Sequence, residues 1–481
     1  MSKIVIICCA SGSRLWQPEL LSRLEAAGHS VAQQKYAGTR GQDARLDRIL
    51  ALEGSRAAGS LARPASPPPQ DAVTTSPDLV IDLIGTRPPG AMPTLTLTLN
   101  GETSLGSGLA AMLGDDLRPE LVVRLNGEIV AIARPMLGDR LWLGRIANDI
   151  LAAAVTLIES VVARFAAGTL EPIAERPEFA SRPRQNLWKQ YIPHIAKGIG
   201  QRALSKLRSR RPFYWRTAYR LIDGDGIAVT GRIDGAAFTE LPDDGQRFYA
   251  DPFAFEHDGR TYLFVEDYPY ASAKGLISGA ELKPDGTFET PRVVIEEPHH
   301  LSYPQVFAHD GEIYMIPESS GASELVLYRA EQFPHSWVRD TVLVSGRKLN
   351  DMTLLIRDDR FWLFGTEQIG QGSASDTMVV WSSQALAGPW TPHPLNPIRI
   401  DRATARPGGR FIERDGRTFL PVQDGTLAYG GGLGLVELLE LSDKVVRFGP
   451  LQPIASGSAW ARQGIHTLDR SGRLEVIDSA G

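Results

Sequence analysis

A hairpin motif that recurs five times in the C-terminal half constrains this chain more than any other feature. Each copy is an apolar run, a tight turn, and a second apolar run that often ends in an acidic residue. The turns fall at Asp258-Gly259, Asp310-Gly311, Asp358-Asp359, Asp415-Gly416 and Ser471-Gly472. Turns of this type between runs of β-branched and aromatic residues are typical of two-stranded β-hairpins. The sequence therefore predicts five copies of one unit.

The interval between hairpins leaves room for two further strands in each repeat. Such strands are predicted at Leu276–Leu282, Glu324–Tyr328 and Thr377–Trp381. A four-stranded unit repeated radially is a propeller blade. The fifth hairpin needs outer strands from the start of the domain, and the candidates are Trp215–Ile222 and Ile227–Ile233. We predict an all-β five-bladed β-propeller over residues 213–481, with a β-sandwich as the alternative.

Composition places the chain among globular proteins with large cores. It has 481 residues, 43% hydrophobic and 22% charged, and a formal net charge of −5, which argues against a nucleic-acid partner. The two cysteines, Cys8 and Cys9, are adjacent in an apolar run and are predicted to be buried thiols. Apolar runs look too short for a membrane span or a signal peptide. We therefore expect a cytoplasmic protein.

The N-terminal part alternates predicted strands and helices. The strands are Lys3–Cys9, Val80–Ile84, Thr94–Leu99 and Leu121–Leu125, and the helices are Pro18–Ala27 and Gly144–Ala167. The segment Gly54–Pro77, rich in Ala, Pro and Ser, is predicted to be a mobile loop. This pattern indicates a small α/β open-sheet domain over residues 1–167. The turn after the first strand lacks the GxGxxG pattern, so no dinucleotide or other cofactor is expected.

The phrase PDLVIDLIG and the order of the strands resemble the N-terminal domain of formyltransferases related to methionyl-tRNA formyltransferase. Those enzymes carry an Asn-x-His pair followed by an Asp, and the matching strand here contains Asn100 but no histidine. Between His29 and His194 the chain has no imidazole to carry the proton. The resemblance therefore implies a degenerate, non-catalytic domain, and formyl or acyl transfer is the weakest of the functional alternatives.

Residues 168–212 form a connector of different character. It is Pro-rich at Glu171–Pro183 and basic over Ile192–Arg211. Its apolar residues Ile195, Ile199, Ala203 and Leu207 fall at helical spacing. The segment is predicted to be either a linker helix with a solvated basic face or a peripheral contact with an anionic membrane through residues 194–211.

The inner strands of a propeller bring residues from separate blades to one axis. The residues predicted there are Asp251, Tyr303, Asp351, Arg406 and His466. Burying five polar side chains together is costly without a ligand, water or mutual contacts. The predicted axis is therefore a candidate site.

The phrases ADPF, NDMT and Gly-Ile-His around Asp251, Asp351 and His466 resemble the inner-strand signatures of family 43 glycoside hydrolases. The resemblance implies that Asp251 is the general base and that Asp351 orients the acid. Where that family has its acidic glutamate this chain has Arg406, which cannot donate a proton near neutral pH but can bind a phosphate, a carboxylate or a sugar hydroxyl. A replacement acid must come from elsewhere, and Glu318 in IPES is the leading candidate.

Other acids and aromatic residues near the second strands could complete a sugar site. The acids Glu266, Asp267 and Asp424 are candidate substrate ligands, although such acids also cap turns or pair with arginines. Candidate aromatic and imidazole contacts are Tyr268, Tyr270, Tyr303, His299 and His300, whereas Trp362 and Trp390 are predicted core residues. The histidines could also hold a metal with His466, but their spacing is not diagnostic.

A longer resemblance, over roughly residues 248–481, is to the propeller domain that precedes the transferase module of plant glucosamine inositolphosphorylceramide transferases and occurs in bacterial proteins. It rests on FYADPFAFEHDGRTYLFVEDY, EEPHHLSYPQVFAHDGEIYMIPES and ARPGGRF. Glycosyl transfer belongs to the other module, so the resemblance does not imply it. Two hypotheses remain: an enzyme acting on glycosidic bonds of an anionic or acyl-modified sugar, or a non-catalytic module that recognises a glycan or glycolipid alongside a protein partner.

Overall fold

The computed structural model describes residues 2–9, 13–36, 41–65, 76–85, 92–179, 185–208, 214–462 and 464–480, with backbone alone at 8, 9, 35, 36, 41, 42 and 205–208. Two compact units divide the chain: Met1–Arg210 with Ile369–Ser373, and Arg211–Gln368 with Ala374–Gly481. Residues 66–75 of the predicted loop Gly54–Pro77 and the thiols of the two cysteines lie outside the described residues. The prediction of a mobile loop was wrong for the start of this segment, because Gly54–Ala57 form a 3-10 helix and Ser60, Leu61 and Ala62 are buried.

The first unit is built on a six-stranded sheet in the order β2-β1-β3-β4-β5-β6. Its strands are β1 Lys3–Cys9, β2 Ser30–Tyr36, β3 Leu79–Asp82, β4 Thr94–Leu99, β5 Leu121–Leu125 and β6 Glu128–Ala133. Strands β2, β1, β3 and β4 pair in parallel, whereas β5 pairs antiparallel with β4 and β6 pairs antiparallel with β5. The predicted α/β sheet is confirmed, and β1, β4 and β5 have the predicted bounds.

In the described part of the first unit, five helices and a 3-10 turn accompany this sheet. They are α1 Trp16–Ala26, α2 Gly41–Glu53, η1 Gly54–Ala57, α3 Leu105–Leu113, α4 Leu143–Ala166 and α5 Leu187–Arg208. Among the described residues α4 is long and apolar enough to cross a membrane, so the expectation that no apolar segment reaches that length was wrong. Of its most apolar window, 78% is buried inside the structure, as in the core helix of a globular domain.

The N-terminus of α4 is held by a buried carboxylate from α2. Glu53 accepts hydrogen bonds from the N–H groups of Leu143 (2.7 Å) and Gly144 (2.8 Å). It also accepts one from the Tyr191 hydroxyl on α5, at 3.0 Å. A carboxylate satisfies the free N–H groups of a helix start and interacts favourably with its dipole. Glu53 therefore joins three helices of the first unit.

The second unit contains five sheets, one for each predicted hairpin. The blades are β9 Arg247–His257 to β12 Arg292–Ile295, β13 Ser302–His309 to β16 Ser336–Ser345, β17 Leu349–Arg357 to β21 Arg399–Ile400, β22 Ile412–Arg414 to β26 Gln452–Pro453, and β27 Leu468–Ser471 with β28 Leu474–Ala480. The predicted third strands are β11 Leu276–Glu281, β15 Glu324–Gln332 and β19 Thr377–Ser383. The remaining strands are β10 Arg260–Pro269, β14 Glu312–Glu318, β18 Arg360–Glu367, β20 Thr391–Pro392, β23 Arg417–Gln423, β24 Leu433–Leu441 and β25 Val446–Phe448. The five-bladed β-propeller is confirmed.

Blade five is completed by strands from the beginning of the unit. β28 pairs with β7 Trp215–Leu221, as predicted, and β7 pairs with β8 Thr239–Glu240. The prediction of a strand at Ile227–Ile233 was wrong, because Ile227–Thr230 form the short helix α6. The buried Glu475 carboxylate accepts a hydrogen bond from the Ile227 N–H at 2.7 Å and so favours a helix start there.

The hairpin turns follow the chemistry of their residues. Asp258, Asp310, Asp358 and Asp415 each have positive φ, as does the residue after each of them. Two positive φ values match the twist of the flanking strands, and Asp and Gly tolerate them best. In the fifth hairpin Ser471 pairs with Leu474, so its turn lies one residue later than predicted.

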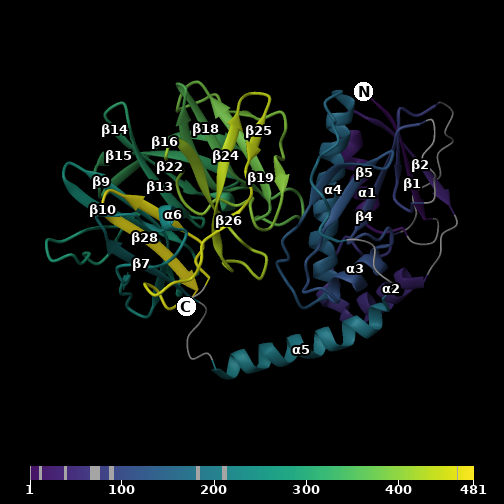
Figure 1. Cartoon of the computed structure of the whole chain (residues 1–481), viewed down its shortest axis with the longest axis horizontal. Coiled ribbons are helices and arrows are strands. Elements are labelled where there is room, and N and C mark those ends of the chain that lie inside the picture. Colours follow the sequence, from purple (N-terminus) through teal and green to yellow (C-terminus); the bar gives the residue numbers. More distant parts are fainter. Residues whose placement is uncertain are drawn as a thin grey trace. The chain divides into compact units, whose positions relative to one another are not determined.

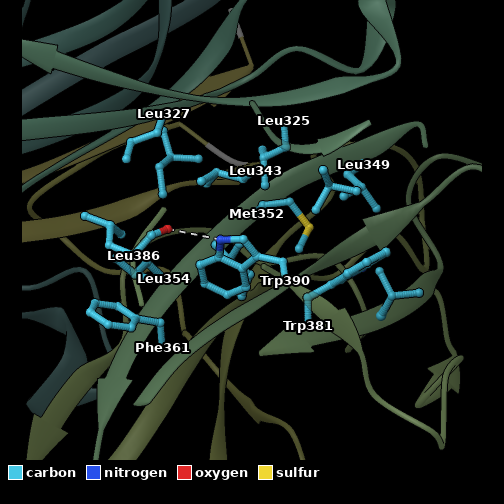
Figure 2. Close-up of a cluster of buried hydrophobic side chains, with 14 residues drawn as sticks. Leu325, Leu327, Leu343, Leu349, Met352, Leu354, Phe361, Trp381, Leu386 and Trp390 are labelled. Carbon is cyan, nitrogen blue, oxygen red and sulfur yellow. Dashed lines mark hydrogen bonds between the residues drawn. The ribbon is translucent and has the colours of Figure 1, made fainter. Parts of the chain in front are cut away.

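Apolar side chains fill the spaces between neighbouring blades. Figure 2 shows the cluster between blades two and three, where Met352 and Trp390 lie among leucines from several strands. The Trp390 indole N–H donates to the Leu386 carbonyl at 3.1 Å, which satisfies its polar atom inside the core. Trp362 is likewise buried, so both tryptophans are core residues as predicted. Figure 1 shows the blades arranged around the ring.

Candidate functional site

Three inner strands carry a left-handed residue at the same place in blades one, two and three. Asp251, Tyr303 and Asp351 have φ values of 46°, 49° and 48°, and the strand register shifts beside each. Such a conformation costs about 1–3 kcal/mol for a residue other than glycine and is often found at functional sites. The following residue, Met352 in blade three, packs in the inter-blade core, while Asp351 contacts blade four.

Asp351 and Arg406 form a two-point ion pair across blades three and four. Arg406 Nε donates to Asp351 Oδ2 at 2.6 Å, and Arg406 Nη2 donates to Oδ1 at 3.1 Å. Gln423 Nε2 donates to the same carboxylate at 2.7 Å, and Arg406 Nη1 donates to Ser375 Oγ at 2.8 Å. Burial alone would lower the pKa of Arg406, but Asp351 outweighs it and raises the pKa well above its ordinary value. Arg406 is therefore charged, and Asp351 neutralises it.

Asp251 and His466 form a second ion pair, across blades one and five. His466 Nε2 lies 3.2 Å from Asp251 Oδ1, and His466 Nδ1 lies 2.7 Å from Asp478 Oδ1. Thr467 Oγ1 donates to Asp251 Oδ1 at 2.9 Å. Burial would lower the pKa of His466, but Asp478 and then Asp251 raise it to about 10. The imidazole is therefore a buried cation between two carboxylates.

Asp478 also fixes the backbone of the first and fifth blades. Its carboxylate accepts hydrogen bonds from the N–H groups of Asp251 (3.0 Å), Thr467 (2.9 Å) and His466 (3.3 Å). The left-handed conformation of Asp251 is thus held by a residue more than two hundred positions away. Asp478 was not predicted from the sequence. The signal was an acid at a position of the last strand, LEVIDSA, where alternation calls for an inward side chain.

Two buried glutamates complete the cluster. Glu318 Oε2 lies 3.5 Å from Arg406 Nη2, and Glu318 Oε1 accepts from Ser320 Oγ at 2.7 Å. Burial, followed by the charge of Asp351, raises the pKa of Glu318 to about 8. Burial and the charge of Asp251 raise the pKa of Glu266 well above its ordinary value. At neutral pH the protonated form of Glu318 is therefore favoured, and Glu266 is shifted in the same direction.

We call Asp251, Glu266, Glu318, Asp351, Arg406, Gln423, His466 and Asp478 the axial cluster. Tyr303, which was predicted to contact a sugar, is fully buried beneath it. Its hydroxyl contacts Thr353 Oγ1 at 2.8 Å and accepts from the Gly409 N–H at 2.7 Å, so it ties blade two to blades three and four. The solvent side of the cluster is marked by Tyr429, which is 46% exposed and lies 5.3 Å from the Arg406 guanidinium.

Tyr429 and Trp215 were not predicted, although both touch His466. The Trp215 ring stacks on the imidazole with centroids 3.9 Å apart, and the Tyr429 ring meets it edge-on at 5.8 Å. A stacked aromatic face is a favourable neighbour for a cationic ring. No motif in the sequence marks these two residues, because they come from the closing strand and from a loop after β23.

The other predicted site residues lie at varying distances from the cluster. His300 Nε2 is 3.3 Å from Glu266 Oε1, and the Tyr268 ring lies 6.1 Å from the His300 ring, so both border the cluster. Asp267 on β10 accepts two hydrogen bonds from Arg247 on β9 and one from Ser278 on β11. Asp424 accepts a local hydrogen bond from the Thr426 N–H. The contacts of Asp267 and Asp424 are those of structural carboxylates.

The Asp251, His466 and Asp478 side chains could also offer ligand atoms to a metal, since these atoms lie within 4.8 Å of one another. Without a metal the two carboxylates hold His466 protonated, so a metal ion would have to displace that proton in order to bind the imidazole.

In the first unit, Asn100 is the residue that the formyltransferase resemblance predicts at the position of the catalytic asparagine. It is buried, its Nδ2 donates to the Arg118 carbonyl at 3.0 Å, and its Oδ1 accepts from the Glu120 N–H at 2.9 Å. Both ends of the amide are thus used by the backbone. The formyltransferase resemblance remains a prediction.

Residues 236–471 match the family model for the N-terminal part of glucosamine inositolphosphorylceramide transferase 1. The protein of that name from Arabidopsis thaliana is 34% identical over 245 residues, which cover 50% of this chain and 32% of that protein. The corresponding protein of Oryza sativa subsp. japonica is 33% identical over 231 residues, covering 46% and 31%. The chain thus spans about a third of the length of these relatives, and the match falls on the propeller.

Solved structures with a similar arrangement include a GH43_1 enzyme from Xanthomonas citri complexed with xylose, at 12% identity and a TM-score of 0.35, covering 48% of this chain and 87% of that one. Another is an exo-β-1,3-galactanase from Phanerochaete chrysosporium with β-1,3-galactotriose, at 12% identity and a TM-score of 0.36, covering 49% and 61%. The fold assignment itself rests on the strand pairing described above.

Proposed function

We propose that the axial cluster of the propeller binds a glycan or glycolipid and acts on a glycosidic bond, with Glu318 as proton donor and Asp251 as base. Glycosidic-bond cleavage by the usual route needs one carboxyl that is protonated and one that is ionised. The observation that carries the proposal is the raised pKa of Glu318, about 8, beside the Asp351–Arg406 ion pair. A carboxyl of this kind holds its proton at neutral pH and can give it to a leaving oxygen.

Asp251 is suited to the opposite role. Its carboxylate accepts a hydrogen bond from the Thr467 hydroxyl at 2.9 Å and lies 3.2 Å from the cationic His466 ring. Asp351 would orient the acid, since its bonds with Arg406 place the guanidinium next to Glu318. The roles of Asp251 and Asp351 are those that the family 43 resemblance implies, whereas Glu318 takes the role for which that family uses another position.

The charge balance of the cluster favours a neutral or cationic sugar. Three carboxylates, of Asp251, Asp351 and Asp478, face two cations, those of Arg406 and His466. Arg406 already gives two N–H groups to Asp351, so an anionic sugar would have to displace that carboxylate. The names of the plant relatives, which mention glucosamine and a phosphorylceramide, are consistent with an amino sugar or glycolipid ligand.

A second candidate is recognition without catalysis, as part of glycan or glycolipid synthesis with a protein partner. It is favoured by burial, because the acid and base candidates Glu318 and Asp251 are only 8% and 5% exposed. In that case the cluster would serve to stiffen the ring, and the glycan would contact the half-exposed residues around it.

One experiment separates the two. The purified protein, D251N and E318Q are screened against neutral sugars, amino sugars, sugar nucleotides and lipid-linked oligosaccharides, with thermal shift and product release recorded together. E312Q, which changes an exposed glutamate on the same strand as Glu318, is the control. We expect both axial variants to lose product release while retaining the thermal shift. Equal turnover by E318Q and the unmodified protein would contradict its role as the acid, and a shift without turnover would establish recognition.

A further inference from the structure

The helix α5 carries two apolar stripes, and the first unit uses one of them. Leu187 and Tyr191 are buried, a ring nitrogen of His194 lies 3.0 Å from the Leu141 carbonyl, and a side chain at Gly198 would collide with Leu141. The spacing of four, three and four residues places these positions on one helical face. This face docks α5 on the first unit.

The other stripe, which we call the free stripe, consists of Ile192, Ala196, Ile199 and Ala203, with the same spacing. All four are exposed; Ile192 is 58% and Ile199 is 51% exposed. Leu204 beside them is 45% exposed. Single exposed apolar residues are common, but a row of them along one helical face marks an interaction surface.

The charges around the free stripe identify its partner. The sequence of α5 contains no acidic residue, while its basic residues are Lys189, Lys197, Arg202, Lys206 and Arg208. Arg202 contacts Asp139 at 2.9 Å, whereas Lys189 and Lys197 are exposed. An apolar stripe on a helix that carries lysines and no acids is the pattern of a helix that lies in the headgroup region of an anionic membrane.

We propose that α5 attaches the protein to an anionic lipid surface through the free stripe, with the lysines contacting the headgroups. Attachment would hold the first unit at the membrane through the docked stripe on the opposite face of the same helix. The inference does not depend on the function proposed for the axial cluster, since α5 belongs to the first unit.

The test uses the full chain and vesicles of phosphatidylcholine with or without about one third phosphatidylglycerol, followed by co-sedimentation. We expect binding only to the anionic vesicles, reduced at high salt, and weakened about ten-fold or more in the I192S/I199S double variant. The control is L52S, which changes a 71% exposed leucine on α2 of the same unit. The K189E/K197E double variant provides a second, charge-based test.

Three outcomes would overturn the proposal. They are the absence of binding to anionic vesicles, equal binding by I192S/I199S and the unmodified protein, and equal loss in L52S. Thermal unfolding of each variant is measured alongside, and because all the changed side chains are exposed we expect unchanged transitions. If I192S/I199S unfolds earlier, the free stripe packs against protein instead and the proposal fails.

Discussion

Replacing Glu318 by glutamine should change how the stability of the propeller depends on pH. Burial, followed by the charge of Asp351, raises the pKa of this carboxyl from 4.5 to about 8. In the unfolded chain the same group titrates near its ordinary value. Between these values the folded protein holds a proton that the unfolded chain has released. The free energy of unfolding therefore falls as pH rises from about 4.5 to about 8, and this contribution is constant above that range.

The structure sets the size of the effect. One proton held across the whole interval corresponds to about 5 kcal/mol, at about 1.4 kcal/mol per pH unit. Arg406 lies 3.5 Å from the carboxyl and partly stabilises its ionised form. Because the two groups are coupled, we expect the decline attributable to Glu318 to be about 2–5 kcal/mol. E318Q keeps the side-chain size and has no group that titrates there, so its stability should decline less by that amount.

Urea unfolding followed by tryptophan fluorescence at about pH 5 and about pH 9 measures this difference, since most tryptophans lie in the propeller. The matched control is E312Q at the other end of β14, whose side chain is 53% exposed. The reasoning is refuted if E318Q loses as much stability as the unmodified protein over this pH range. It is equally refuted if E312Q reduces the loss of stability over the same pH range as much as E318Q does.

Three further changes test other parts of the structure. D478N removes a buried carboxylate that accepts hydrogen bonds from three N–H groups and pairs with His466. It should lower the stability of the propeller by about 2–4 kcal/mol and bring the pKa of His466 down from about 10. An imidazole that stays charged above about pH 9 in an NMR titration of this variant contradicts the prediction. E53A should destabilise the first unit by about 3 kcal/mol, since three hydrogen bonds to a buried carboxylate are lost, and an unchanged thermal transition of that unit argues against it. G409A should prevent folding of the propeller, because φ is +141° and the added carbon would lie 1.9 Å from the Leu468 carbonyl oxygen; a soluble variant with the normal circular dichroism spectrum refutes the geometry.

Local patterns in the sequence predict the propeller well because a hairpin is a local structure. Turn residues such as Asp258 and Asp310, with alternating apolar neighbours, contain nearly all the information that the two strands need. The failure of the strand prediction at Ile227–Ile233 has a non-local cause. Its segment is apolar enough for a strand, but Glu475, from the other end of the unit, caps a helix there.

The residues of the candidate site also differ in whether the local sequence could predict them. Residues at the repeated inner-strand position, such as Asp251 and Asp351, could be predicted because the repeat shows where the axis lies. Asp478 and Tyr429 could not, because their roles come from pairing and loop placement across blades. The protonation of Glu318 was also beyond the sequence, since it depends on burial and on one neighbouring carboxylate.

The way blade five is closed determines how late in synthesis the propeller can complete its ring. β7 is synthesised first among the strands of its blade, whereas its partner β28, which pairs Ala480 with Trp215, is the last strand of the propeller in the chain. At ~10 residues per second the ribosome takes on the order of half a minute to make the intervening chain. During that time β7 presents an open edge, and the axial cluster lacks His466 and Asp478. An incompletely synthesised chain therefore has neither a closed ring nor a complete site, and the two arise together when the last strand is added.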